Sequence, residues 1–315
     1  MEAIIVLTYR CNAHCHMCNT WKYPTSEGEE ITADLLRKLP RGMRFANITG
    51  GEPFLRGDIE EAVGIMKSKT RRLVISTNGY FTDAISDLAK RNRDIGFRIS
   101  LEGLPAANDE LRGLKDGFDH GLRTLIRLHE LGIKDIGFGI TMSDRNAGDL
   151  LELYGLARWL GVEFATAAVH NGYYFHKFDN VIKEKAAIER ALTELIGLQM
   201  REGNPKSWFR AYFNHGLIRY INGGKRLLPC AMGSDVFLLD PLGEIRPCNA
   251  MEETMGNLNE SSFDEIWYGE RADRVRRSVE NCQKNCWMVG SAAPAMKKEI
   301  LKPAFWVLRN KGRSA

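Results

Sequence analysis

The sequence predicts an α/β protein in which a partial (β/α)6 barrel is followed by a small extension that carries four cysteines. Two observations lead to this prediction. Strand-like and helix-like segments alternate along residues 3–168, which is typical of a parallel sheet with helices outside it. The segments after these strands are rich in polar residues and glycine, as is usual at the carboxyl edge of such a sheet. Six strand–helix units fit an open or partial barrel better than a complete one, which has eight.

The predicted elements follow the chain in a regular order. An apolar first strand leads to a helix that begins after Thr32, whose side chain is suited to be its N-cap. The alternation then continues up to residue 168, and two longer helices follow. The predicted strands are residues 3–8, 44–49, 72–76, 95–100, 135–141 and 162–168, and the predicted helices are residues 31–39, 58–69, 82–90, 119–131, 147–160, 181–201 and 207–222.

Composition excludes several classes of protein. No apolar run approaches the roughly 18–20 residues of a membrane-spanning helix, and the run at residues 3–7 is too short for a signal peptide. We therefore expect a cytoplasmic protein whose seven cysteines are metal ligands or reactive thiols rather than disulfides. The net charge of +4 is concentrated after Cys286, so the rest of the chain is close to neutral. We expect no nucleic-acid partner, because such proteins usually spread basic residues over their body.

Each predicted strand ends in a segment suited to binding a ligand. Because the carboxyl ends of parallel strands meet at one edge of the sheet, these segments should lie close together. They are residues 11–18 (CNAHCHMC), 50–53 (GGEP), 76–79 (STNG), 100–103 (SLEG), 141–143 (TMS) and 170–171 (HN).

The first of these segments holds three cysteines, Cys11, Cys15 and Cys18. Three thiolates can hold three irons of a 4Fe–4S cluster and leave the fourth open to a substrate or cosubstrate. The Cys-x3-Cys-x2-Cys spacing after the first strand of a βα barrel resembles the radical S-adenosylmethionine (SAM) superfamily, and the resemblance covers residues 3 to about 170. The alternative is a structural zinc site that borrows His14 or His16.

The resemblance implies a role for each matching residue. The three cysteines would ligate the cluster, whose open iron would take the amino and carboxylate groups of SAM, and the GGEP segment would contact the methionine amino group. Other strand-end residues would meet the methionine carboxylate, the ribose or the adenine, although Asn78 and Ser100 are equally suited to plain strand-end hydrogen bonds. The implied cofactor-binding residues are Met17, Gly50, Gly51, Glu52, Pro53, Ser76, Asn78, Ser100, Glu102 and Arg112.

The other four cysteines are Cys230, Cys248, Cys282 and Cys286. A hairpin turn is predicted at residues 240–243, and helices at 262–268 and 270–280 separate the two pairs. This pattern resembles the twitch extension, a shortened SPASM domain that binds one auxiliary 4Fe–4S cluster. A zinc site of four cysteines is the alternative.

These assignments divide the chain into four predicted parts. They are a radical SAM barrel (1–175), a helical linker (176–227), the twitch or SPASM-like domain (228–290) and a basic amphipathic tail (291–315). The aromatic residues at 172–176 are expected to pack against the linker helices, and the alternative is that they line a substrate pocket.

The resemblance implies reductive cleavage of SAM to a 5′-deoxyadenosyl radical, driven by an external one-electron reductant of the flavodoxin or ferredoxin type. The radical would abstract a hydrogen from a small carbohydrate- or cyclitol-like substrate, as in the 2-deoxy-scyllo-inosamine dehydrogenase family, and the auxiliary cluster would accept an electron. The three-plus-four division leaves no cysteine as a hydrogen donor, which favours dehydrogenation over epimerisation. The first strand begins at residue 3, without a preceding leader-recognition domain, which argues against a ribosomally made peptide as the substrate. An iron–sulfur or zinc scaffold or regulator is the non-enzyme alternative.

The tail at residues 294–313 alternates apolar and basic residues. We expect its apolar side to pack on the barrel, since Pro303 interrupts any long helix. The alternative is that the tail lies on an anionic membrane surface and brings the site to a lipid-linked substrate. The apolar residues are Met296, Ile300, Leu301, Phe305, Trp306, Val307 and Leu308, and the basic residues are Lys297, Lys298, Lys302, Arg309, Lys311 and Arg313.

Overall fold

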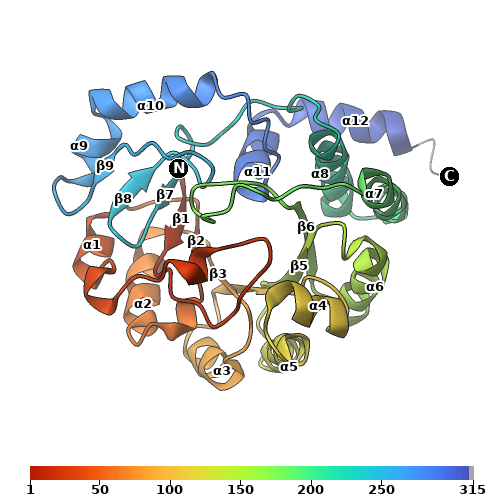
Figure 1. Cartoon of the computed structure of the whole chain (residues 1–315), viewed down its shortest axis with the longest axis horizontal. Helices are drawn as coiled ribbons and strands as arrows, with labels where there is room; N and C mark the ends of the chain where they lie inside the picture. Colours follow the sequence, from red (N-terminus) through yellow and green to blue (C-terminus); the bar gives the residue numbers. More distant parts are fainter. Residues whose placement is uncertain (312–315) are drawn as a thin grey trace.

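Six parallel strands form the first part of one continuous sheet, in a computed structural model that describes residues 1–311. The strand order in the sheet is β6-β5-β4-β3-β2-β1-β7-β8-β9 (Figure 1), and every neighbouring pair from β6 to β7 is parallel. The predicted partial barrel is therefore confirmed. The strands are β1 Glu2–Val6, β2 Phe45–Thr49, β3 Leu73–Thr77, β4 Gly96–Ser100, β5 Ile136–Met142, β6 Glu163–Ala168, β7 Val236–Leu239, β8 Glu244–Arg246 and β9 Gly256–Asn257.

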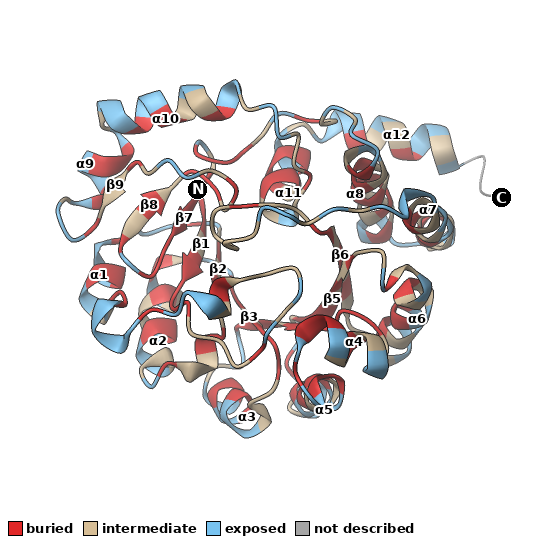
Figure 2. Cartoon of the chain, viewed as in Figure 1, coloured by how far each residue is buried: buried red, intermediate tan, exposed pale blue. Residues whose placement is uncertain are grey.

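The helices between the parallel strands surround the sheet, and their buried faces point inward onto it (Figure 2). Thr32 caps the first of them as predicted, because its side chain accepts a hydrogen bond from the backbone N–H of Leu35 at 3.4 Å. The helices are α1 Ala33–Lys38, α2 Ile59–Lys69, α3 Thr82–Arg91, α4 Pro105–Arg112, α5 Gly117–Glu130, α6 Leu150–Leu160, α7 Lys185–Arg201, α8 Pro205–Ile221, α9 Phe263–Trp267, α10 Glu270–Glu280, α11 Val289–Lys298 and α12 Leu301–Lys311.

Helix α4 is absent from the sequence prediction, which placed a single helix between β4 and β5. The segment has eight residues, too few to give a sustained hydrophobic pattern, but its boundaries have ordinary signals. Pro105 occupies the first turn, where a missing N–H costs nothing, and Gly113 ends the helix in a left-handed conformation at φ 53°. The helix matters for the site because its last residue is Arg112.

The C-terminal cysteine-rich segment adds strands to the same sheet. β7 pairs in parallel with β1, with Glu2 opposite Val236 and Ile5 opposite Leu239, and the predicted hairpin then leads into β8. β1 is thus an internal strand with neighbours on both sides. The division of the chain at residues 175, 227 and 290 stays a prediction.

Trp287 anchors the segment after the last cysteine onto α8. Its indole is 2% exposed, stacks on Phe213, and donates from Nε1 to the Phe213 carbonyl oxygen at 2.8 Å. A Cβ atom on Gly216 would lie 2.2 Å from the indole ring, so only glycine leaves room for this contact. Arg226 covers the ring at 5.3 Å.

The tail forms two helices, α11 and α12, with the break at residues 299–300. Pro303 lies in the first turn of α12 rather than interrupting a helix. The predicted packing is correct for one face only, because Val307 is buried while Leu301 and Phe305 are exposed. Arg313 lies outside the described residues. No helix within residues 1–311 has the length and hydrophobicity needed to cross a bilayer.

Because Trp287 packs closely on α8, one methyl group added at Gly216 should strongly lower the stability of the protein. Gly216→Ala should lower the free energy of unfolding by about 1–3 kcal/mol, because the indole must move out of a packed site. Gly155→Ala, in α6, meets no atom within 4 Å and should be neutral or stabilise by up to about 1 kcal/mol. Chemical denaturation of both variants measures the difference, and equal stabilities would contradict the anchoring role of Trp287.

Candidate active site

The cysteine loop, residues 11–18, follows β1 and is fixed by backbone hydrogen bonds to α4. The N–H groups of His14 and His16 donate to the carbonyl oxygens of Arg112 and Leu111, at 2.9 and 2.8 Å. A Cβ atom on Gly113 would lie 2.7 Å from the His14 carbonyl oxygen, so the left-handed glycine that ends α4 also permits this close approach. The loop is therefore positioned by main-chain atoms.

The GGEP segment holds the other side of this loop. The N–H of Gly51 donates to the Thr8 carbonyl oxygen at 2.7 Å, and the N–H of Glu52 donates to the Arg10 carbonyl oxygen at 2.9 Å. A Cβ atom on Gly51 would lie 2.1 Å from that Arg10 oxygen. The glycines are thus required by the close approach of two backbones at the point where the cysteine loop begins.

The three thiols of the cysteine loop gather around one buried cation. Burial raises the pKa of Cys11, Cys15 and Cys18, to about 12 for Cys11, and the nearby charge of Arg112 lowers the pKa of all three. The N–H of Ala13 donates to the Cys11 sulfur at 3.4 Å. Thiolates in such a site need positive charge and N–H donors around them, and the chain supplies both.

Glu52 joins the loops after β2 and β3. Its buried carboxylate accepts hydrogen bonds from the Thr77 hydroxyl and the Asn78 N–H, both at 2.8 Å, and from the Phe54 N–H at 3.1 Å. Burial raises its pKa. The Asn78 side chain in turn donates to the side-chain oxygen of Asn12 at 2.7 Å, which links β3 directly to the cysteine loop.

Arg112 pairs with Glu102 at 3.3 Å, and Glu102 also accepts from the Thr141 N–H at 2.5 Å. The pair is buried, yet the Nε atom of Arg112 and the Nδ2 atom of Asn12 have no hydrogen-bond partner among the described residues. Buried N–H donors without a partner are costly, so acceptors belong beside them. The cluster and SAM, with their sulfides and carboxylate, offer such acceptors. The donor set therefore fits the groups that the sequence implies.

The remaining predicted residues have less specific surroundings. Ser76 donates from its hydroxyl to the side-chain oxygen of Asn47 at 3.0 Å. The carbonyl oxygen of Met17 accepts from the Asn180 side chain at 3.1 Å. Ser100 is the half-buried last residue of β4. Pro53 begins the short helix that follows Glu52. The roles assigned to these residues in binding SAM stay predictions.

The zinc alternative finds no support in the described part of the chain. The ring of His14 lies 4.4 Å from that of Trp21 in a tilted contact, and Nδ1 of His16 lies 3.1 Å from a guanidinium nitrogen of Arg145. Within residues 1–311 no three His, Cys, Asp or Glu side chains converge as ligands of a single ion would. The thiols of a 4Fe–4S cluster bind different irons and need not converge in that way.

The aromatic stretch 172–176 packs against the cysteine loop, which corrects the prediction that it packs against the linker helices. Tyr174 donates from its hydroxyl to the Gly50 carbonyl oxygen at 2.7 Å, and the Asn19 N–H donates to the Phe175 carbonyl oxygen at 2.8 Å. Burial raises the pKa of Tyr174, and the nearby Cys18 thiolate raises it further. Tyr174 is thus a site residue that was not among the predicted site residues, although the alternative that its stretch lines a substrate pocket rested on the same density of aromatic residues.

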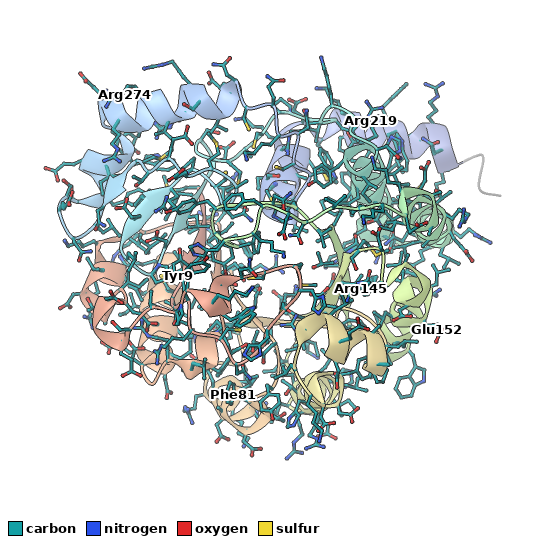
Figure 3. All side chains as sticks on the ribbon, in the orientation of Figure 1. Tyr9, Phe81, Arg145, Glu152, Arg219 and Arg274 are labelled. Atoms are coloured by element: carbon teal, nitrogen blue, oxygen red, sulfur yellow. The ribbon has the colours of Figure 1, made fainter. Side chains whose placement is uncertain are left out.

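The mouth of the barrel lies between residues from distant parts of the chain. Tyr9, from the loop after β1, and Arg145, from the loop after β5, lie on opposite sides of the central region in Figure 3. Tyr9 contacts Tyr174, with ring centroids 6.1 Å apart. The stretch 172–176 therefore packs beside the residues that follow β1.

The other four thiols gather at a second place. Burial raises the pKa of Cys248 to about 11, and nearby Cys230 and Cys286 raise it further. Cys282 in turn raises the pKa of Cys286, so each of the four thiols lies near at least one other. Three separate segments supply them, and four thiols are the number that a fully ligated cluster requires.

Two family models match the chain and together cover about two thirds of it. The model of the radical SAM superfamily matches residues 5–157, and the SPASM iron–sulfur cluster-binding domain matches residues 230–287. The chain therefore has a 4Fe–4S site that binds SAM and a domain for auxiliary iron–sulfur binding.

Several known proteins are similar over much of the chain. Pre-heme d1 synthase of Dinoroseobacter shibae is 28% identical over 84% of this chain and 72% of its own length. Mycofactocin maturase MftC of Mycolicibacterium smegmatis is 25% identical over 94% of this chain and 85% of its own length. Fe-coproporphyrin III synthase of Methanosarcina barkeri is 33% identical, over 48% of this chain and 39% of its own length.

Solved structures share the fold at low identity. Native anSMEcpe with bound AdoMet has a TM-score of 0.63 at 14% identity, with 99% of each chain covered. Streptococcus suis SuiB bound to SAM has a TM-score of 0.64 at 16% identity, covering 85% of this chain and 65% of that one.

The names of these relatives concern hemes and maturation of other molecules, so they give no support to a sugar or cyclitol substrate. The fold, the two groups of thiols and both family models agree with one another. The chain is accordingly a radical SAM protein with a C-terminal SPASM iron–sulfur domain.

Proposed function

We propose that this protein is an enzyme that oxidises a C–H bond of its substrate with SAM bound at Cys11, Cys15 and Cys18. The observation that supports this most directly is the unpaired Nε of Arg112, buried beside all three thiols. When bound, the first cluster supplies the electron that cleaves SAM to a 5′-deoxyadenosyl radical, and the second supplies an acceptor for an electron of the substrate.

The chain's own residues hold and orient these groups. Arg112, fixed by Glu102, places a positive charge near the thiols and keeps an Nε–H donor without a partner among the described residues. Asn12 presents a second free donor, and its oxygen is already fixed by Asn78. The buried ring of Tyr9 and the partly buried ring of Tyr174 pack with Leu238 of β7, which limits the access of water to this side of the cysteine loop. We propose an external one-electron reductant of the flavodoxin or ferredoxin type.

The substrate class we favour is a peptide. The relatives named as maturases include MftC and the sporulation killing factor maturation protein SkfB of Bacillus subtilis, which is 22% identical over 90% of this chain. A tetrapyrrole is the second candidate, because pre-heme d1 synthase and AdoMet-dependent heme synthases also match most of the chain. The carbohydrate dehydrogenation expected from the sequence has no such support.

Substrate pools labelled with deuterium at carbon can separate these candidates. The reduced enzyme is incubated with SAM and a peptide pool, iron coproporphyrin III, or an aminocyclitol pool. The pool that transfers deuterium into 5′-deoxyadenosine contains the substrate. Transfer from the aminocyclitol pool alone would overturn the peptide proposal.

Cluster content should divide between the two groups of thiols. The anaerobically reconstituted protein should hold roughly eight iron and eight sulfide, as two 4Fe–4S clusters require. Changing Cys11, Cys15 and Cys18 to alanine should halve the iron and abolish 5′-deoxyadenosine. Changing Cys230, Cys248, Cys282 and Cys286 to alanine should remove the other half. Iron analysis of both variants checks this, and full iron in the first variant would contradict the assigned site.

Arg112 should control SAM binding more than cluster binding. In Arg112→Lys the charge remains but the Nε donor is lost, so SAM affinity should fall by roughly 10–100-fold while iron content is retained. Arg123→Lys, on the exposed side of α5, is the matched control and should bind SAM as the parent does. The spectral change of the reconstituted cluster on titration with SAM measures the affinity. Parental affinity in Arg112→Lys would exclude a contact through Nε.

A further inference from the structure

Helix α12 lies at the outer edge of the molecule, against α8 and α7 (Figure 1). Its inner face is well packed. Val307 is 5% exposed and contacts Met200 and Ala211, and the ring of Trp306 lies 5.6 Å from that of Tyr212. The helix is thus held in place by one face only.

The opposite face of α12 exposes large apolar side chains. Leu301, Phe305 and Leu308 are 80%, 68% and 75% exposed. Their spacing of four and three residues puts them on one side of the helix, opposite the face that carries Trp306 and Val307. Single exposed apolar residues are common, but three in a row along one helix face form a continuous stripe that water solvates poorly.

Basic residues border this apolar stripe on both sides. Lys302 and Arg309 are three residues before and four residues after Phe305, and both are exposed. On the other side, Lys311 follows Leu308 by three residues, with its ammonium 3.3 Å from the centre of the Trp208 ring. Helix α12 contains no acidic residue, and Glu299 just before it pairs with Lys302.

We propose that the stripe of Leu301, Phe305 and Leu308 docks α12 onto an anionic lipid surface. The apolar side chains would enter the boundary between headgroups and acyl chains, and the flanking cations would contact lipid phosphates. At 11 residues the helix is too short to span a bilayer, so it would lie in the plane of the surface.

The charge pattern favours lipid over a second copy of this chain. A two-fold contact through the stripe would place Lys302 and Arg309 against the same residues of the other copy, and like charges would oppose it. The proposal is independent of what the catalytic site acts on, and its test does not use activity.

Vesicle co-sedimentation tests the proposal on the full chain. Vesicles of phosphatidylcholine with equimolar phosphatidylglycerol should bind the protein at about 50 mM salt, and binding should fall at least fivefold at about 500 mM. Vesicles of phosphatidylcholine alone should bind it at least fivefold less.

Two double variants separate the apolar and the charged contributions. Phe305→Ser/Leu308→Ser and Lys302→Gln/Arg309→Gln should each lower binding to the anionic vesicles at least fivefold. The controls are Trp159→Ser/Tyr268→Ser, whose side chains are 81% and 73% exposed elsewhere, and Arg123→Gln/Lys134→Gln. Both controls should bind as the parent does, and unchanged melting temperatures show that all four variants are folded.

Three outcomes would overturn the proposal. They are no binding to anionic vesicles, binding that the α12 variants leave unchanged, and concentration-dependent self-association that Phe305→Ser/Leu308→Ser abolishes in the absence of lipid. The last result, measured by light scattering, would assign the stripe to an interface between copies of the chain.

Discussion

The site depends on main-chain contacts that hold the cysteine loop from both sides. The backbone of GGEP hydrogen-bonds to the backbone of Thr8 and Arg10, just before the loop. The backbone at the end of α4 hydrogen-bonds to that of His14 and His16, within the loop. Neither contact tolerates a larger residue at Gly51 or Gly113. Because backbone atoms make these contacts, the three thiols are positioned before any cofactor binds, which lowers the entropic cost of ligation.

Much of the barrel could be predicted from the sequence because its signals are local. Each of the first six strands is a short apolar run that ends in polar or glycine-rich residues, and the three-cysteine spacing lies after the first. Helix α4 was missed because eight residues are too few for a sustained periodic pattern. The pairing of β7 with β1 joins residues more than two hundred positions apart, and a local sequence pattern cannot predict such a contact.

Within the site, residue types were easier to predict than surroundings. The sequence pointed to Glu52, Glu102 and Arg112 as site residues. It could not show that the carboxylate of Glu52, after β2, accepts hydrogen bonds from the end of β3, or that the Nε of Arg112 has no hydrogen-bond partner among the described residues. The substrate expectation had a weaker basis. It used the absence of a spare cysteine and of a preceding domain, and neither constrains the shape or polarity of what binds. The tail is a similar case. Its composition predicted an amphipathic segment, but it did not predict which of its apolar residues would be buried against the rest of the protein.

The pairing of β1 with both β2 and β7 also orders events during synthesis. The ribosome delivers β2 soon after β1, whereas β7 begins only at residue 236. At typical elongation rates the interval is on the order of tens of seconds. Throughout it, the strand that leads into the cysteine loop has one unpaired edge. The sheet around β1 is therefore complete only after most of the chain has emerged, and the strand before the three thiols depends on the second half of the molecule for its last neighbour.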